Sequence, residues 1–173
     1  MNTVFTAETM PHLRAVLEEY AAALLADYRD KLLPHNAGGD LITTATARVS
    51  TATGMTWDVI FNLQDYWKYI EDGTRPHWPP PGSLLPWIRV KPVIPRPDDK
   101  GRLPTEKQLD FLIRRKIARE GTQGSHDLER AERDVLPDYM EKIHKALLQD
   151  ATEWTTTYVT ESFRELNPAP VEI

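Results

Sequence analysis

Several absences in the sequence exclude whole classes of function. None of the 173 residues is a cysteine, which excludes disulfides, thiolate metal sites and cysteine nucleophiles. No apolar run approaches the roughly 18 residues that a membrane-spanning helix needs. Residues 1–11 lack a basic stretch followed by an apolar one, so we expect no signal peptide. We therefore expect a protein of the reducing cell interior, or one released by lysis.

Catalytic signatures are also lacking. The sequence holds neither standard form of glycine-rich phosphate loop and no Gly-x-Ser-x-Gly motif. Its five histidines are scattered without helical i, i+4 spacing, so we expect no metal site, no cofactor and no enzyme. Glu71 and Asp72 form a carboxylate pair, but adjacent helical residues point apart. A hydrolase that uses this pair is a remote alternative to a solvated helix end or a salt bridge with Arg75.

Charge is divided unevenly along the chain. The whole chain has 21 basic and 26 acidic residues, a formal charge of −5. Between Pro86 and Arg119, ten basic residues stand against four acidic ones, whereas the remainder has 11 basic and 22 acidic residues. Regions of opposite sign can steer a partner or let copies of one protein dock head to tail. Alternatively, the basic and acidic regions are ordinary solvent-exposed surfaces that bind no partner.

Proline, in contrast, is abundant. The chain has 14 prolines, and nine of them fall between Pro76 and Pro104. Each proline fixes φ and lacks an N–H, so this region can hold only short helices and extended connections. Because the flanking segments have good caps and apolar stripes, we predict a stiff, ordered docking loop.

The sequence patterns predict an α+β fold in a single domain, residues 1–173. Apolar residues at three- and four-residue steps predict long N-terminal and C-terminal helices, and threonine-rich alternation predicts a small antiparallel β-hairpin or sheet. A lone hairpin is marginal in water, so its apolar face should pack on helices. The expected elements are helix 11–33, strands 41–53 and 55–63, short helices 65–72 and 83–91, a proline-rich loop 92–104, helix 105–120 and long helix 136–166.

Capping residues define several of these boundaries. Asp65 and Ser83 are expected N-caps of the two short helices. Thr105 with Gln108 forms a capping box at the start of the clearest helix. The glycines expected just after helix ends are Gly73 and Gly121.

Aromatic and basic residues mark a candidate interface. Tryptophan and tyrosine are favoured at buried protein interfaces, although a local core under the proline loop would also use them. The basic run 114–119 is expected on the exposed arc of its helix, facing an acidic neighbour or DNA. The far half of the last helix either packs on another chain or folds back on the first helix. The candidate interface residues are Trp67, Tyr69, Thr74, Arg75, His77, Trp78, Trp87, Arg114, Arg115, Arg119, Trp154 and Tyr158.

Three blocks in the sequence carry a resemblance. Residues 69–80 (YIEDGTRPHWPP) join a tyrosine, an acid-glycine-threonine turn and a proline-rich loop, and a short tryptophan-bearing helix follows. Residues 113–122 (IRRKIAREGT) form a basic-apolar helix that closes in glycine-threonine, and Gly39-Asp40-Leu41 is a weaker first block. In this order the blocks resemble the tail-completion, or head–tail joining (neck), proteins of long-tailed double-stranded DNA bacteriophages. Residues 124–127 depart from that family, which commonly has a proline-aromatic pair there.

The resemblance implies a structural virion protein without catalytic activity. Such a subunit forms a homo-oligomeric ring, with six-fold symmetry favoured, at the neck or the head-proximal end of the tail. Its partners would be copies of itself and tail-tube, tail-terminator or head-connector proteins, with nonspecific contact to genomic DNA in the lumen and no membrane. It would be made in the bacterial host cytoplasm and reside in the virion. Opposite charges on one subunit suit the head-to-tail contacts that a ring needs.

A small nucleic-acid-binding regulator is the alternative from another class. The basic helix segment 114–119 could contact phosphates without sequence specificity. No aromatic-interleaved RNA motif accompanies it, and the chain as a whole is acidic, unlike most nucleic-acid-binding domains. This alternative predicts an affinity for DNA that falls steeply with salt and is lost when Arg114 and Arg115 are replaced.

Overall fold

The computed structural model describes residues 9–35, 40–51, 56–91 and 93–166, and the fold is α+β as predicted. The chain has two compact units, and the single domain expected from the sequence stays a prediction. Unit 1 comprises Met1–Asp27, Thr46–Asn62 and Ala131–Ile173, and unit 2 comprises Tyr28–Ala45 and Leu63–Arg130. The two long helices contribute residues to both units, and each unit is described by itself.

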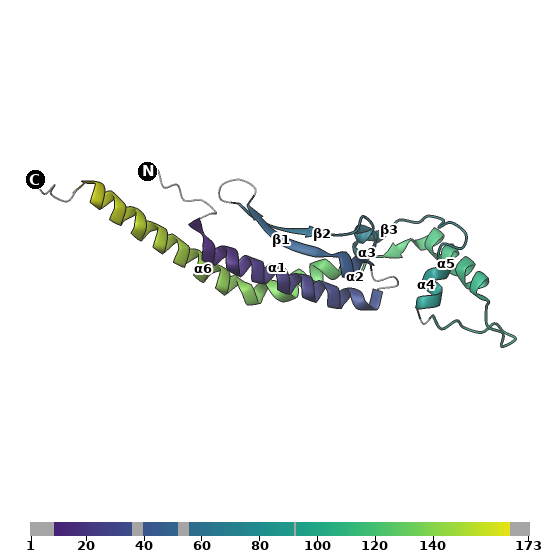
Figure 1. Cartoon of the computed structure of the whole chain (residues 1–173). Helices are drawn as coiled ribbons and strands as arrows, with labels where there is room; N and C mark the ends of the chain where they lie inside the picture. The colour runs from purple at the N-terminus through teal and green to yellow at the C-terminus, as the bar shows by residue number, and fades with distance from the viewer. Residues whose placement is uncertain (1–8, 36–39, 52–55, 92, 167–173) are drawn as a thin grey trace, which may run out of the picture. The chain divides into compact units, whose positions relative to one another are not determined.

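Unit 1 combines the long helices with a β-hairpin (Figure 1). The hairpin is antiparallel, with Ala47 opposite Phe61 and Val49 opposite Val59, so the predicted apolar face is confirmed. Trp57 at the start of the second strand packs against a core that includes Leu13. The elements are α1 (Pro11–Leu32), β1 (Thr46–Thr51), β2 (Trp57–Asn62) and α6 (Asp127–Leu166).

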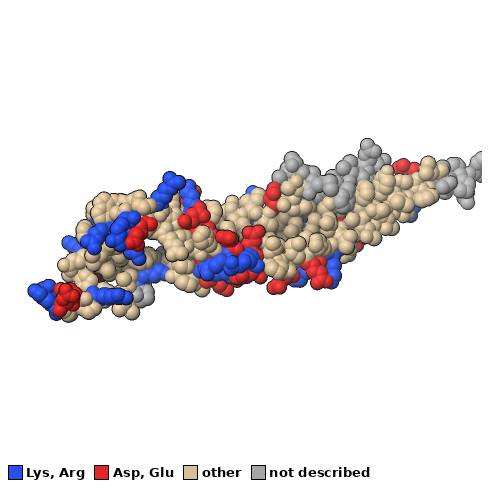
Figure 2. All heavy atoms as spheres, turned by 180° about the vertical axis from the view of Figure 1, so that it is seen from behind, with Lys and Arg blue, Asp and Glu red and all other residues tan. Residues whose placement is uncertain are grey.

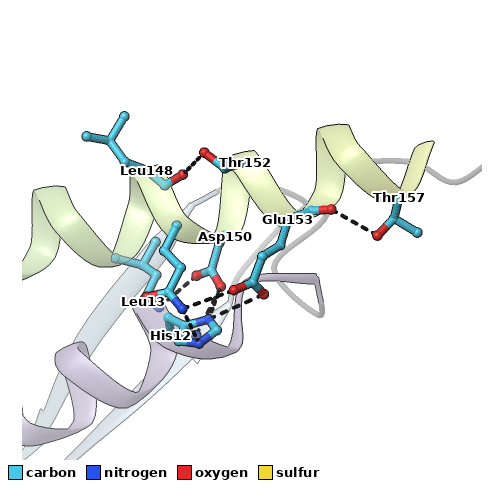
Figure 3. Close-up of polar contacts among 8 residues, drawn as sticks. His12, Leu13, Leu148, Asp150, Thr152, Glu153 and Thr157 are labelled. Carbon is cyan, nitrogen blue, oxygen red and sulfur yellow. Dashed lines mark hydrogen bonds and ion pairs between the residues drawn. The ribbon is translucent and has the colours of Figure 1, made fainter. Parts of the chain in front are cut away.

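A buried carboxylate of α6 closes the start of α1 (Figure 3). The Asp150 side chain is fully buried, and its two oxygens accept the backbone N–H groups of His12 at 3.1 Å and Leu13 at 2.7 Å. The same carboxylate lies 2.8 Å from Nδ1 of His12. Because the first N–H groups of a helix have no acceptor within the helix, Asp150 acts as a remote N-cap. The helix α6 therefore folds back on α1 as far as Asp150, and residues 151–166 run on past Pro11 (Figure 1).

Unit 2 consists of short elements around α5. Its small sheet pairs Gly73 with Gln123 and Thr74 with Thr122 in an antiparallel arrangement. The elements of this unit, besides the ends of α1 and α6, are η2 (Leu33–His35), α2 (Asp40–Thr44), α3 (Trp67–Glu71), β3 (Gly73–Thr74), α4 (Leu85–Val90), α5 (Glu106–Glu120) and β4 (Thr122–Gln123).

Several local predictions are confirmed. Thr105 caps α5, and both hydrogen bonds of the predicted capping box with Gln108 are present. Gly73 and Gly121 follow α3 and α5 with φ of 76° and 74°, the left-handed conformation that favours glycine at helix ends. The helix α4 of the proline-rich region is short, as expected, with six residues, and Pro86 lies in its first turn, where the missing N–H costs little.

Other boundaries were predicted wrongly. The expected strand 41–53 begins instead with the helix α2, in which the Thr44 hydroxyl donates to the Asp40 carbonyl at 2.5 Å and Leu41 is buried. The long helix starts at Asp127 rather than residue 136 and continues through Pro137. Gly39 of the weaker first block, the ends of the expected strands at 52–53 and 55, and Pro92 of the proline-rich loop lie outside the described residues.

The two expected short-helix caps are also wrong. Tyr66 rather than Asp65 is the N-cap of α3, and no side chain closes it locally. In α4, the N-cap is Leu84 rather than Ser83. The Ser83 hydroxyl instead donates to the Pro80 carbonyl at 2.8 Å. A local hydrogen bond of the serine thus replaces the expected cap.

Candidate interaction surface

The β3–β4 pairing brings the two main sequence blocks together within unit 2. Thr74 of the first block lies opposite Thr122 of the second, and their hydroxyl oxygens are 2.9 Å apart. A Cβ on Gly73 would lie 2.2 Å from the Thr122 carbonyl oxygen, and one on Gly121 only 2.0 Å from that of Thr74. Both glycines are therefore required by close backbone approach as well as by their positive φ. The two blocks form one continuous surface.

Arg114 fastens the proline-rich loop to α5. Its Nε donates to the Pro79 carbonyl at 2.8 Å, and its guanidinium lies 5.4 Å from the centre of the Trp78 ring. The guanidinium also reaches Asp110 at 3.4 Å, one helical turn earlier. Only 13% of the Arg114 side chain is exposed, so the expectation that it faces outward with the rest of the basic run is wrong. Arg114 turns inward because its guanidinium lies over the Trp78 ring and donates a hydrogen bond to the Pro79 carbonyl.

Asp110 holds the start of α4 from the other side. Its carboxylate is buried and accepts the backbone N–H groups of Gly82 at 3.2 Å and Leu84 at 3.4 Å. The N-cap of α4 has no side-chain acceptor of its own, so Asp110 supplies one from α5. The loop that carries Trp78 and the helix that carries Trp87 are thereby fixed on α5.

Four predicted interface residues line one shallow hollow around β3. They are Tyr69, Thr74, Arg75 and His77. His77 is held by its Nδ1, which lies 2.9 Å from the Arg75 carbonyl, and by its backbone N–H, which donates to Ile117 of α5 at 3.4 Å. Tyr69 is 55% exposed, so its aromatic ring is accessible at the edge of this hollow.

Two grooves flank α5. One is lined mainly by apolar atoms and includes Trp87, Ile117 and Lys116. The other lies between the loop 96–104 and α5, and basic and apolar side chains share it; we call it the basic groove. It is defined by Arg96, Arg102, Leu103, Lys107, Phe111 and Leu112. On the face drawn in Figure 2, Lys and Arg side chains gather at the α4–α5 end.

The remaining predicted residues lie in different surroundings. Trp67 in α3 is half-buried, whereas Arg115 is exposed. Arg119 is exposed and hydrogen-bonds its neighbour Glu120, which lowers the pKa of that carboxyl. Trp154 and Tyr158 belong to unit 1, where their rings stack with centres 5.3 Å apart. The predicted set is thus divided between a surface on unit 2 and the end of α6.

Of the carboxylate pair considered for hydrolysis, Glu71 and Asp72, Glu71 has a structural role. Glu71 is buried, and its oxygens accept the backbone N–H groups of Leu128 and Glu129 at 3.1 Å, which caps α6. The expected solvated position is therefore wrong for Glu71. Burial raises the pKa of the neighbouring Tyr28 well above its ordinary value, and Glu71 contributes to the shift, so the phenol stays neutral. Within the described ranges, no three histidine, aspartate or glutamate side chains converge as metal ligands.

Sequence patterns alone do not reveal Asp110 and Phe111 as part of this surface. Phe111 is 50% exposed and its ring centre lies 6.2 Å from that of Trp78. The i, i+4 spacing of Asp110 and Arg114 was the available signal, because residues so spaced meet on a helix face. It could not show that the pair also reaches the loop 79–84.

Comparison with known proteins adds no assignment. No family model matches the chain, and no curated protein and no solved structure matches it significantly. Among the helices that the structure describes, none is long and apolar enough to cross a membrane.

Proposed function

We propose that this protein is a structural subunit of a tailed-phage virion that joins the head connector to the tail as part of a homo-oligomeric ring. The observation that carries the proposal is the pairing of β3 with β4, because it unites the two resembling sequence blocks on one side of unit 2. The paired residues Thr74 and Thr122 are 48 positions apart in the chain, yet two glycines permit their backbones to approach closely. If the two blocks resembled the phage family only by chance, there would be no reason for them to pair in the fold.

The chemistry of this surface supports binding to protein. Trp78, Trp87 and Tyr69 expose 55%, 38% and 55% of their area, and aromatic anchors of this kind dominate protein interfaces. Arg114 and Asp110 hold the loop beneath them, so little order is lost when a partner binds. A rigid platform that presents aromatic side chains is suited to lasting assembly contacts.

Co-expression with the products of the neighbouring genes tests the proposal. We expect the chain to co-purify with a tail-tube, tail-terminator or head-connector protein and to form rings in negative-stain images. The variant Trp78→Ala/Trp87→Ala should weaken this association by about tenfold or more, since both rings are exposed anchors. The exposed Val90→Ala serves as the matched control. A chain that stays monomeric and co-purifies with no neighbour would contradict the proposal.

DNA binding is the second candidate, because Lys107, Arg115 and Lys116 are all exposed along α5. It predicts an affinity for duplex DNA that falls steeply with salt and is lost in Arg115→Ala/Lys116→Ala. Arg114 is unsuitable for this test, since its replacement would disturb the proline-rich loop. DNA retention with no ring or partner would favour this candidate.

A further inference from the structure

We propose that residues 151–166 of α6, here called the arm, dock in the basic groove of a second copy. The inference rests on the proposed ring function and deepens it by naming the contact between neighbouring subunits. The arm belongs to unit 1 and the basic groove to unit 2, so every copy carries one of each.

The arm presents an apolar stripe to its surroundings. Val159, Phe163 and Leu166 are 44%, 63% and 77% exposed. Their spacing of four and three residues places them on one face of the helix. A stripe of large apolar side chains on a helix is ordinarily covered by another element.

The composition of the arm indicates that its helix depends on packing. Residues 155–160 (TTTYVT) are all β-branched or aromatic, which are weak helix formers. The threonine hydroxyls each donate to the carbonyl four residues earlier, as Thr156 does to Thr152 at 2.8 Å, an arrangement that slightly destabilises a helix. Helices in proteins gain most of their stability from a packed apolar face, so this segment gains order by docking.

The basic groove complements the arm in its exposed apolar side chains and in its charge. Leu103, Phe111 and Leu112 are 63%, 50% and 45% exposed along it, and Arg96 and Lys107 stand beside them. Arg102 in the groove is held by Asp98 at 2.9 Å, which keeps the loop folded, while the pKa of Asp98 is lowered by the hydrogen bonds from Arg102. The arm carries three glutamates, at positions 153, 161 and 165, against one arginine. An acidic helix with an apolar stripe thus matches a basic groove with an apolar floor.

A second copy is the occupant that this pairing favours. Arm-to-groove contact is head-to-tail, and repetition of such a contact around an axis closes a ring. A symmetric arm-to-arm pair would instead bring the glutamates of two copies together, which like-charge repulsion opposes.

Complementation between two variants of the full chain tests the proposal. The arm variant is Phe163→Ala/Leu166→Ala, and the groove variant is Lys107→Glu/Leu112→Ala. Each variant alone should self-associate about tenfold or more weakly than the parent, because exposed anchors are lost. When mixed, they should form a one-to-one heterodimer, since the intact arm of one meets the intact groove of the other. Mass photometry and sedimentation velocity measure both results.

Two matched control variants distinguish loss of the arm–groove contact from a general loss of folding. Leu148→Ala removes a 67% exposed side chain of α6 before the arm, and Val90→Ala removes a 60% exposed one outside the groove. Neither should change self-association. Below the concentration at which the parent associates, the far-UV circular dichroism and thermal unfolding of every variant should match those of the parent, because every altered side chain is exposed.

Other outcomes overturn the proposal in distinct ways. A groove variant that associates normally while the arm variant does not would show arm-to-arm pairing. Loss of DNA retention alone in the groove variant would show that the groove binds nucleic acid. Absence of a heterodimer would show docking within one chain or no docking. If both variants still enter rings with neck proteins, the arm contact is wrong and the neck function stands; if the parent forms no ring and binds no neighbour, the neck function itself fails.

Discussion

Buried carboxylates organise this molecule at the scale of single residues. Among the described residues, four acidic side chains are buried, and three of them accept backbone N–H groups at the start of a helix that lies elsewhere in the chain. Asp150 closes α1, Asp110 closes α4 and Glu71 closes α6. Negative charge at a helix start also meets the positive end of the helix dipole. Each carboxylate therefore fastens two segments that are distant in sequence.

Replacement of Asp150 tests this role. In Asp150→Ala, the N–H groups of His12 and Leu13 lose their acceptor in a buried place, so the free energy of unfolding should fall by about 2–3 kcal/mol. Urea denaturation measures the change. The control is Glu153→Ala, because Glu153 is 57% exposed and only approaches His12 at 3.9 Å; it should cost under about 0.5 kcal/mol. Equal costs would contradict a capping role for Asp150.

Neighbouring arginines of α5 should behave very differently. Arg114→Ala removes the donor to Pro79 and the cation over Trp78, so the free energy of unfolding should drop by about 2 kcal/mol. Arg115→Ala changes an exposed side chain and should stay within about 0.5 kcal/mol of the parent. Tryptophan fluorescence should shift only in the first variant. Matching unfolding curves for the two variants would argue against the inward position of Arg114.

At the scale of elements, the shortest pair of strands is the most informative. The strands β3 and β4 have two residues each, and their contact depends on glycines at both ends. The loop 76–84, although rich in proline, is ordered because α5 holds it through Arg114 and Asp110. The proposed docking platform consists of loops, turns and short helices rather than a large sheet.

Three glycine variants separate backbone strain from steric conflict. Gly101→Ala has φ of +76° but no atom within 4 Å, so it should cost only about 1 kcal/mol of unfolding free energy. In Gly124→Ala, the added Cβ would lie 2.1 Å from the Glu71 carbonyl oxygen, although φ at this position is not positive. Gly73→Ala combines both problems and should cost about 3 kcal/mol or more. Thermal or urea unfolding should rank them with Gly101→Ala mildest; a Gly73→Ala protein as stable as Gly101→Ala would contradict the β3–β4 contact.

Patterns of local origin could be predicted from the sequence, and remote contacts could not. The apolar stripe of α1, the hairpin and the capping box at Thr105 depend on spacings of a few residues, and all three are present. The start of α6 was misplaced because its cap is Glu71, a residue 57 positions earlier. The sequence predicts interface residues in both blocks, and their role stays a prediction. Their juxtaposition depends on strands too short to show any alternation in sequence, and Arg114 turns inward because of remote contacts with Pro79 and Trp78.

At the scale of the whole molecule, two units divide the chemistry between them. Unit 2 carries the paired sequence blocks and the basic residues of α5, and unit 1 carries the arm. In the proposed head-to-tail contact, the basic segment 86–119 of one copy would meet acidic residues of the next. Association through such charges should weaken as salt rises, while the apolar part of the contact persists.

The central claim is that this chain works by assembling into a closed ring. Native mass spectrometry of the chain, purified with the co-expressed products of its neighbouring genes, tests it most directly. We predict one discrete species that contains a fixed number of 19.8 kDa subunits, with six favoured, together with a neck or tail protein. A single unassociated subunit at every concentration, with no neighbour bound, would contradict the account.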